Sequence, residues 1–369
     1  MSELDFNAAA SRGRQQRLLA EMQSLKLDLA IVQTTENVQW LTGARYPWTM
    51  SPAAALSADG RLTLVAPKKP AIEAAADEVV HYEAQWHSTL RNDQRQAASV
   101  ELLKAIGNKS GPRRIGVEYS CFTGHMAEIE GEAIDIEPTI YRLRRRKDAD
   151  ELARIRKAIA GTERMYARAR EIIEPGITEI AVFNQLQAAA VEEFGEMMTG
   201  TGNDYQCGAR GGAPRNGRKA QDGELYILDL GPAYRGYYAD NSRAFAVNRK
   251  PTQEQLAAWS AIMQTFKHIE ATVKPGKSCR DLFNEVQAML DKAPHGVFNH
   301  HLGHGIGLFP HEAPHLNPHW DDTFEVGDVF TCEPGLYDEK VLRVGMRLEN
   351  DYVVTESGIE NLSPFGMEL

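Results

Sequence analysis

The sequence lacks the features of membrane, exported and nucleic-acid-binding proteins. No apolar run approaches the roughly 20 residues that cross a bilayer, and residues 1–16 hold no hydrophobic signal core. The formal net charge is −10 with no basic tail or stripe, so we expect neither nucleic acid nor a membrane surface as a partner. The four cysteines form no CxxC pair, which is typical of free thiols in a reducing compartment. We therefore expect a cytoplasmic protein.

A chain of 369 residues is long for one core, so the sequence predicts two domains. Alternating strand-like and helix-like segments predict a small N-terminal α/β domain over residues 1–143. A basic stretch, residues 142–147, then leads to Asp148 and Glu151, whose spacing predicts a capped helix start. We interpret the basic stretch as a solvated linker and residues 144–369 as the second domain.

The second domain contains an internal repeat. Residues 174–188 recur as residues 274–288, with Pro, Gly, Phe, Asn, Gln and Ala at the same spacing. Each copy follows a long helical pattern, and Thr178 or Ser278 begins the next helix. Strand-like segments follow each helix pair, so the predicted fold class is α+β with two duplicated halves that face each other.

Each half contributes acidic residues from a strand pair. A hairpin that turns around residues 234–236 places Asp229 and Asp240 on neighbouring strands. A buried carboxylate such as Asp229 needs a metal ion or a salt bridge. Taken alone, Asp229 is explained equally well by a metal ion or by a salt bridge to Arg235 or Arg243.

In the second half, Glu333 ends a strand and residues 344–354 alternate. That alternation places Arg347, Glu349 and Asp351 on one face. Converging carboxylates repel one another unless they share a cation.

Histidine is concentrated between these strands, with seven of the chain's eleven histidines in residues 295–319. His304 stands in a glycine-rich segment that lets the backbone approach closely. No glutamate follows His300, so the segment is not the HExxH motif of zinc proteases. Oxygen ligands with one imidazole favour Mn, Co, Fe or Zn in a non-structural site.

The order of Asp229, Asp240, His304, Glu333 and Glu349 resembles the ligand set of the pita-bread metallopeptidases, which include prolidase, Xaa-Pro aminopeptidase and creatinase. Residues 38–43 resemble the creatinase-type N-terminal domain. The resemblance implies a C-terminal pita-bread fold, two divalent ions with manganese most favoured, and a homodimer that pairs through the N-terminal domain. That domain would also form part of the substrate pocket.

The resemblance also implies a role for each matched residue. Asp240 and Glu349 would bridge the two ions, Asp229 would bind the first, and His304 and Glu333 the second. A hydroxide held between the ions would attack the scissile amide carbonyl while Glu333 shuttles the proton. Among the pocket residues implied, His311 would hydrogen-bond the carbonyl oxygen as it becomes an oxyanion, and His300 would also line the pocket. Arg347 would pair with nearby carboxylates or with the substrate's own carboxylate.

One position departs from the family pattern. Prolidases carry a further catalytic histidine near the position of Gly212, but no histidine occurs between His125 and His268. Arg210, Arg215 or Asn216 are the alternatives for that space. We therefore predict an aminopeptidase P-like or prolidase-like hydrolase that takes a peptide substrate. The alternative is a non-peptidase member of the family that acts on another small amide or metabolite, and a scaffold that keeps only the fold is disfavoured by the complete ligand set.

Overall fold

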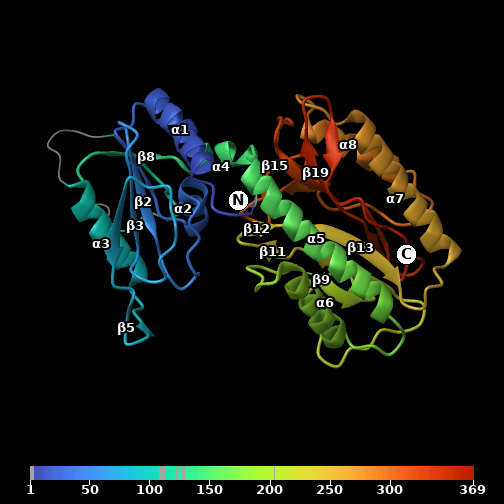
Figure 1. Cartoon of the computed structure of the whole chain (residues 1–369). Coiled ribbons are helices and arrows are strands. Elements are labelled where there is room, and N and C mark those ends of the chain that lie inside the picture. The colour runs from blue at the N-terminus through green and yellow to red at the C-terminus, as the bar shows by residue number, and fades with distance from the viewer. Residues whose placement is uncertain (1–3, 108–113, 122–123, 126–128, 203) are drawn as a thin grey trace. The chain divides into compact units, whose positions relative to one another are not determined.

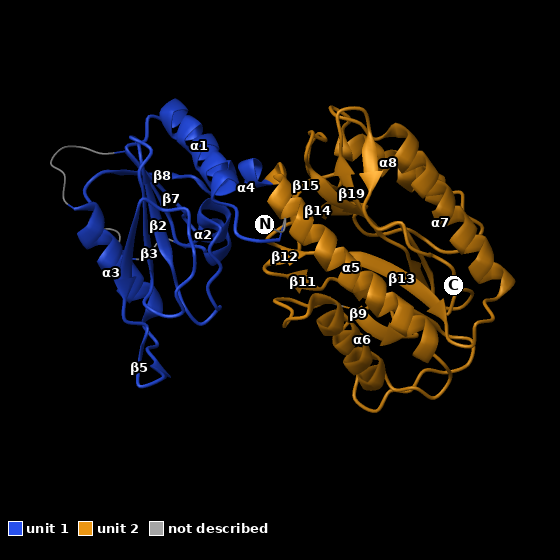
Figure 2. Cartoon of the chain, viewed as in Figure 1, with its two compact units in different colours: residues 1–144 blue, residues 145–369 orange. Residues whose placement is uncertain are grey.

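The computed structural model describes residues 4–107, 114–121, 124–125, 129–202 and 204–369. The chain divides into two units, Met1–Arg144 and Arg145–Leu369 (Figure 2). Within the described residues, no helix is both long and apolar enough to cross a membrane.

Unit 1 is built on a six-stranded mixed sheet in the order β4-β3-β2-β1-β7-β8 (Figure 1). Its strands are β1 (Leu29–Val32), β2 (Ala53–Ser57), β3 (Leu62–Pro67), β4 (Glu78–Tyr82), β7 (Arg114–Val117) and β8 (Glu132–Asp135), with a small hairpin of β5 (Gln85–Trp86) and β6 (Thr89–Leu90). The helices are α1 (Ala8–Leu25), α2 (Thr35–Thr42), α3 (Gln94–Ile106) and α4 (Glu137–Arg145). Every residue of β1 is buried, so both faces of the sheet are covered at this central strand.

The basic stretch at the unit boundary is not a solvated linker, and that interpretation was wrong. Its first half completes helix α4, and Arg145 is buried against the fully buried Asp328 at 2.6 Å. Lys147 is also buried and lies 3.3 Å from Glu312. Both cations therefore pair with buried acids of the second unit instead of facing solvent. The sequence alone does not show which acids the fold will bury.

Unit 2 contains two helix pairs, each followed by strands. The first half is α5 (Ala149–Ile172), α6 (Glu179–Phe194), β9 (Asp204–Cys207), β10 (Leu225–Leu230), β11 (Ala233–Tyr234), β12 (Tyr237–Tyr238) and β13 (Asn241–Ala246). The second half is α7 (Gln253–Thr272), α8 (Cys279–Leu290), β14 (Gly303–Gly305), β15 (Glu312–Leu316), β16 (Val329–Cys332), β17 (Gly335–Asp338), β18 (Val344–Arg347), β19 (Asn350–Val354) and β20 (Ile359–Asn361). A capping box begins α5 at Asp148 and another begins α7 at Thr252.

The two helix pairs cover two hydrophobic cores. Helices α5 and α6 pack on β9, β10 and β13, whereas the core under α7 and α8 includes β15, β16 and β19 and also side chains of β10 and β13. The side chains of Thr178 and Ser278 cap α6 and α8, as the repeat predicts. Two helix-covered sheets in one unit are the pita-bread arrangement that the sequence predicts.

One predicted strand is interrupted. Residues 344–354 form β18 and β19, which pair with β17 and β16 respectively, so the chain changes sheets at Leu348 and Glu349. Strands β10–β13 repeat this pattern, with the short β11–β12 hairpin between two longer strands. The switch matters because it leaves Glu349 outside both ladders.

Candidate metal centre

Strand register places Asp240 and Glu349 at equivalent points of the two halves. Leu230 is opposite Asn241 in the β10–β13 pair, and Cys332 is opposite Asn350 in the β16–β19 pair. Each acid immediately precedes its paired asparagine, where the chain enters the outer strand. Both carboxylates are buried.

Asp229 and Glu333 do not occupy equivalent positions. Asp229 lies inside β10, opposite Ser242 on one side and Asp204 on the other. Glu333 follows the end of β16, and its backbone N–H donates to the Leu302 carbonyl at 2.8 Å. The remaining acid of the first half therefore lies within a strand, whereas that of the second half lies just after one.

All five predicted ligands line one open pocket of about 280 Å³ in unit 2. Its lining comprises Asp204, Arg210, Asp229, Asp240, His300, His301, His304, His311, Glu333, Arg347 and Glu349. The pocket therefore combines carboxylates and imidazoles with two guanidinium groups.

Ligand-type atoms in this pocket fall into overlapping groups whose members lie within 4.8 Å of one another. One group is Asp229, Asp240 and Glu349, and a second is His304, Glu333 and Glu349. Glu349 belongs to both groups. Two adjacent cation positions that share one carboxylate are compatible with this arrangement.

The buried carboxylates repel one another, and a bound cation would reduce that repulsion. Burial, followed by the charge of Asp229, raises the pKa of Asp240 well above its usual range. Burial and the charge of Asp240 do the same for the pKa of Glu349.

Among the described residues, Asp229 Oδ1 and Glu349 Oε2 are buried without a hydrogen-bond donor. Buried, unpartnered carboxylate oxygens fit a divalent cation.

The imidazole of His304 is in the neutral form that binds metal. Burial lowers the pKa of His304 to about 3, so its ring is neutral at physiological pH. Its Nδ1 lies 3.0 Å from the Gly305 carbonyl, which leaves Nε2 facing Asp240 and Glu333 at 3.7 Å each. His311 stacks on the His304 ring at a centroid distance of 3.6 Å.

His301 is a member of the pocket to which the sequence gives no separate role. Its Nε2 lies 2.8 Å from Glu333 Oε1. Burial would raise the pKa of Glu333, but the hydrogen bond and charge of His301, together with His304 and Arg347, outweigh burial and lower that pKa to about 2. His300 lies deeper, with Nε2 3.0 Å from the Tyr337 hydroxyl, and burial lowers its pKa to about 4.

Arg347 is the partner of Asp229, rather than Arg235 or Arg243. Its Nη2 donates to Asp229 Oδ2 at 2.6 Å and also to Asp204. Arg235 instead pairs with Glu196, and Arg243 donates mainly to backbone carbonyls such as that of Glu349. Arg347 thus offsets part of the negative charge of Asp204 and Asp229.

Of the three residues proposed to replace the absent histidine, only Arg210 lines the pocket. Arg215 pairs with buried Glu179, and Asn216 is exposed. Of the seven clustered histidines, four line the pocket, whereas His315 pairs with Asp322 at 2.8 Å. Asp204 was missed because only strand pairing brings it beside Asp229.

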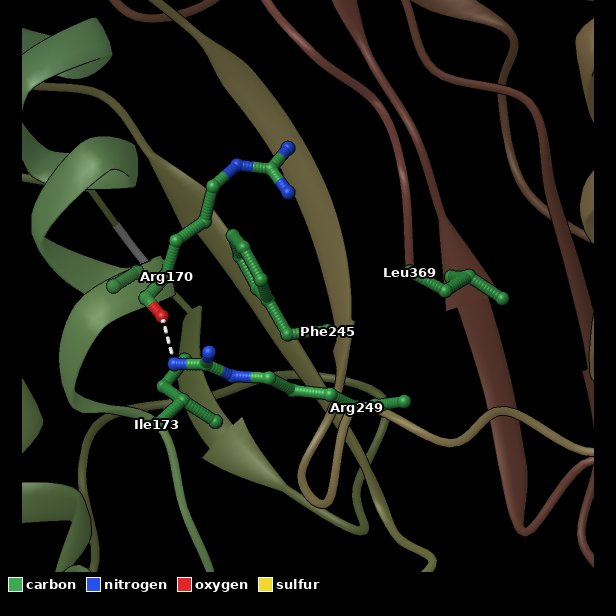
Figure 3. A pocket seen from close by; sticks show the side chains of 7 residues that line it. Arg170, Ile173, Phe245, Arg249 and Leu369 are labelled. Carbon is green, nitrogen blue, oxygen red and sulfur yellow. Dashed lines mark hydrogen bonds between the residues drawn. The ribbon is translucent and has the colours of Figure 1, made fainter.

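A second hollow, of about 250 Å³, lies at the surface of the first half (Figure 3). The Arg170 side chain extends over the Phe245 ring, and Arg249 donates to the Arg170 carbonyl at 2.7 Å. Its lining side chains include no carboxylate and no imidazole. They cannot ligate a hard cation or shuttle a proton, so the carboxylate pocket is the candidate active site.

Known proteins share both units. The sequence profile of metallopeptidase family M24 matches residues 153–356, and that of the creatinase/prolidase N-terminal domain matches residues 14–146. An uncharacterised peptidase of Staphylococcus aureus is 25% identical over 358 residues, which cover 95% of this chain and 98% of that protein.

Solved structures share the fold across nearly the whole chain. The Xaa-Pro dipeptidase from Bacillus anthracis has a TM-score of 0.81 at 22% identity, covering 97% of this chain and 99% of that one. The prolidase from Pyrococcus furiosus has a TM-score of 0.77 at 22% identity, covering 94% and 99%. Aminopeptidase P from E. coli has a TM-score of 0.77 at 19% identity, covering 98% and 95%. With the fold, the carboxylate pocket and both profiles in agreement, the chain belongs to metallopeptidase family M24, as the sequence predicts.

Proposed function

We propose that this protein is a dinuclear-metal-dependent hydrolase of Xaa-Pro bonds, of the aminopeptidase P or prolidase type. The observation that carries the proposal is the pair of ligand groups that share Glu349, with buried oxygens that lack donors. Family M24 peptidases use divalent metals. The similar solved proteins include prolidases and an Xaa-Pro dipeptidase, which supports a proline-containing substrate.

The proposed ligands are Asp229, Asp240, His304, Glu333 and Glu349, with Asp240 and Glu349 shared. Divalent ions bound there would supply Lewis-acid polarisation of the substrate carbonyl and a water of lowered pKa. The mixed oxygen and imidazole donors favour manganese, with cobalt, zinc or iron as alternatives.

The protein's own groups would hold the substrate and move the proton. Glu333 would accept a proton from the attacking water and pass it to the leaving amine, and His301, at 2.8 Å, holds that carboxylate in place. His311 would donate a hydrogen bond to the carbonyl oxygen as negative charge develops there. His300, whose ring nitrogens lie against the His301 carbonyl and the Tyr337 hydroxyl, would line the pocket.

A non-peptidase reaction on another small amide is the second candidate. The observation that favours it is Arg210, which lines the pocket in a chain that has no histidine in that region. A different side chain at the substrate-facing wall is compatible with a different substrate.

The test is hydrolysis of Xaa-Pro dipeptides and longer Xaa-Pro peptides by Mn(II)-loaded or Co(II)-loaded protein, with products identified by mass spectrometry. We expect cleavage by the wild type and none by Asp240→Asn. Full metal occupancy without cleavage of either substrate class would contradict the peptidase proposal and favour the second candidate.

Two further properties remain predictions from the family resemblance and the sequence. We expect a homodimer that pairs through the N-terminal domain, and a cytoplasmic location. Light scattering coupled to size-exclusion chromatography tests the first, and a monomer mass at all concentrations would contradict it.

A further inference from the structure

We propose that Arg210 determines substrate specificity by binding a carboxylate of the substrate. The inference rests on the proposed function, because it names the substrate class of the same pocket. A pocket of about 280 Å³ that contains both the ligand groups and Arg210 favours a short substrate whose carboxylate lies close to the hydrolysed bond.

Arg210 lies on a loop, residues 208–215, that is fixed at both ends. The side chain of Glu179 is completely buried and accepts from the backbone N–H of Cys207 at 3.0 Å and of Arg215 at 2.7 Å. The Arg215 guanidinium then pairs with the same carboxylate at 2.6 Å. One buried acid therefore holds the start and the end of the loop together.

The middle of the loop is held by Asp204 and Arg347, which line the same pocket as the proposed ligands. Asp204 accepts from the backbone N–H of Gly212 at 2.6 Å and also pairs with Arg347. Arg347 in turn donates to the backbone carbonyl of Arg210 at 3.4 Å. These contacts link the acids of the pocket to the Arg210 backbone. The position of Arg210 relative to the proposed ligands is therefore fixed by hydrogen bonds and ion pairs.

The Arg210 side chain is oriented but not neutralised. Its Nη2 donates to Asn299 Oδ1 at 2.7 Å, and its guanidinium carbon lies 3.8 Å from the centre of the Tyr337 ring. No carboxylate of the described residues lies within ion-pair distance of it, although the side chain is exposed in the pocket. An oriented guanidinium with free donors is suited to a planar, bidentate carboxylate.

The other guanidinium of the pocket cannot take this role as readily. Arg347 is buried and already pairs with Asp204 and Asp229. Its Nε has no hydrogen-bond partner among the described residues but is buried, and its Nη2 pairs with both acids. Turning the guanidinium toward a substrate would leave a buried acid unpaired, which is costly. The substrate carboxylate is therefore assigned to Arg210.

The experiment compares wild type, Arg210→Ala and Arg210→Lys in the full Mn(II)-loaded chain. The control is Arg164→Ala, which removes an exposed arginine that does not line the pocket. Three substrates separate the sources of the carboxylate. Ala-Pro carries it on the main chain, Glu-Pro-amide carries it on a side chain, and Ala-Pro-amide has none.

We expect Arg210→Ala to raise KM by about 10- to 100-fold for the substrate whose carboxylate it binds, with kcat nearly unchanged. Arg210→Lys should give a smaller rise in KM, since lysine keeps the positive charge but cannot bind a carboxylate through two parallel N–H donors. A loss confined to Ala-Pro identifies the main-chain carboxylate, and a loss confined to Glu-Pro-amide identifies the side chain. Equal effects on all three substrates, including Ala-Pro-amide, would overturn the assignment.

Calorimetric titration with proline and prolinamide gives a readout that does not depend on turnover. We expect Arg210→Ala to weaken proline binding by a similar factor and to leave prolinamide binding unchanged, with metal content equal to wild type. Arg210-dependent ligand binding without any Xaa-Pro hydrolysis would overturn the proposed function while keeping the carboxylate assignment. Hydrolysis that is insensitive to Arg210 would overturn the assignment alone.

Discussion

At the scale of single residues, Glu349 and Asp240 dominate the energetics of the pocket. Their burial beside Asp229 concentrates negative charge where water cannot screen it. The same arrangement that favours a cation destabilises the metal-free protein, because nothing else in the described residues pairs with the buried Glu349 Oε2. Function and stability therefore oppose each other here.

This opposition predicts an inverted effect of Asp240→Asn. In chelator-treated protein at pH 8, the variant should unfold at a temperature about 2–4 °C higher than wild type. Folding raises the pKa of Asp240, which costs stability at every pH above the unfolded pKa, and asparagine does not titrate. Adding Mn(II) should raise the unfolding temperature of the wild type and not of the variant. Differential scanning calorimetry measures both effects.

Asp321→Asn is the control, since Asp321 is exposed and outside the pocket. It should follow wild type with and without metal. A metal-free Asp240→Asn that unfolds below metal-free wild type would show that the carboxylate stabilises the empty site.

At the scale of elements, the loop of residues 208–215 depends on Glu179 at the start of α6. Burial would raise the pKa of Glu179, but the hydrogen bonds from Arg215 and Cys207 outweigh burial and hold that pKa below its ordinary 4.5. The lowered pKa means that the folded state prefers the charged carboxylate. The loop is therefore held in place by charge-assisted hydrogen bonds to the Glu179 carboxylate.

We expect Glu179→Gln to lower the free energy of unfolding by about 2 kcal/mol at neutral pH. The difference from wild type should be complete above the ordinary pKa of 4.5 and should disappear as pH falls through the lower folded pKa. Urea denaturation across pH 3–7 measures this dependence, with Glu192→Gln, an exposed position on the same helix, as the control. A difference that persists unchanged at the lowest pH would contradict the charged contact.

The elements also show how far the sequence could predict the site. The order of Asp229, Asp240, His304, Glu333 and Glu349 was readable because each lies in a recognisable motif on a strand or at its end. Asp204 and His301 were not assigned, because their importance arises from register and from ring packing across elements. The break at Glu349 was not predicted, since alternation continues through the residues where the chain changes sheets.

At the scale of the whole molecule, the first residues of the second unit hold it together through buried charge. Arg145 donates to both oxygens of Asp328, at 3.0 and 2.6 Å, and to the carbonyl of Thr323 at 2.7 Å. The sequence could not reveal this, because a run of arginines beside a predicted boundary has the composition of a solvated linker. Only the folded strand that buries Asp328 distinguishes the two cases.

Replacing Arg145 by Met should therefore lower the free energy of unfolding by about 3–5 kcal/mol, since Asp328 would remain buried without its partner. Arg146→Met changes the neighbouring exposed arginine and should stay within about 0.5 kcal/mol of wild type. Denaturant unfolding of the two variants provides the comparison. Equal stability of the two would mean that water replaces the Arg145 contacts.

The register of the duplicated strands carries a consequence for the origin of the centre. Only Asp240 and Glu349 occupy matching positions, whereas Asp229 is opposite Ser242 and Glu333 lies beyond the end of its strand. If the two halves arose by duplication, this matching pair of acids is what both copies still present. In the proposed two-ion centre, an ion on one side of Asp240 and Glu349 would meet different donors from an ion on the other side, because the imidazole and the remaining acids do not match. Loading of such a centre is expected to proceed in two unequal steps.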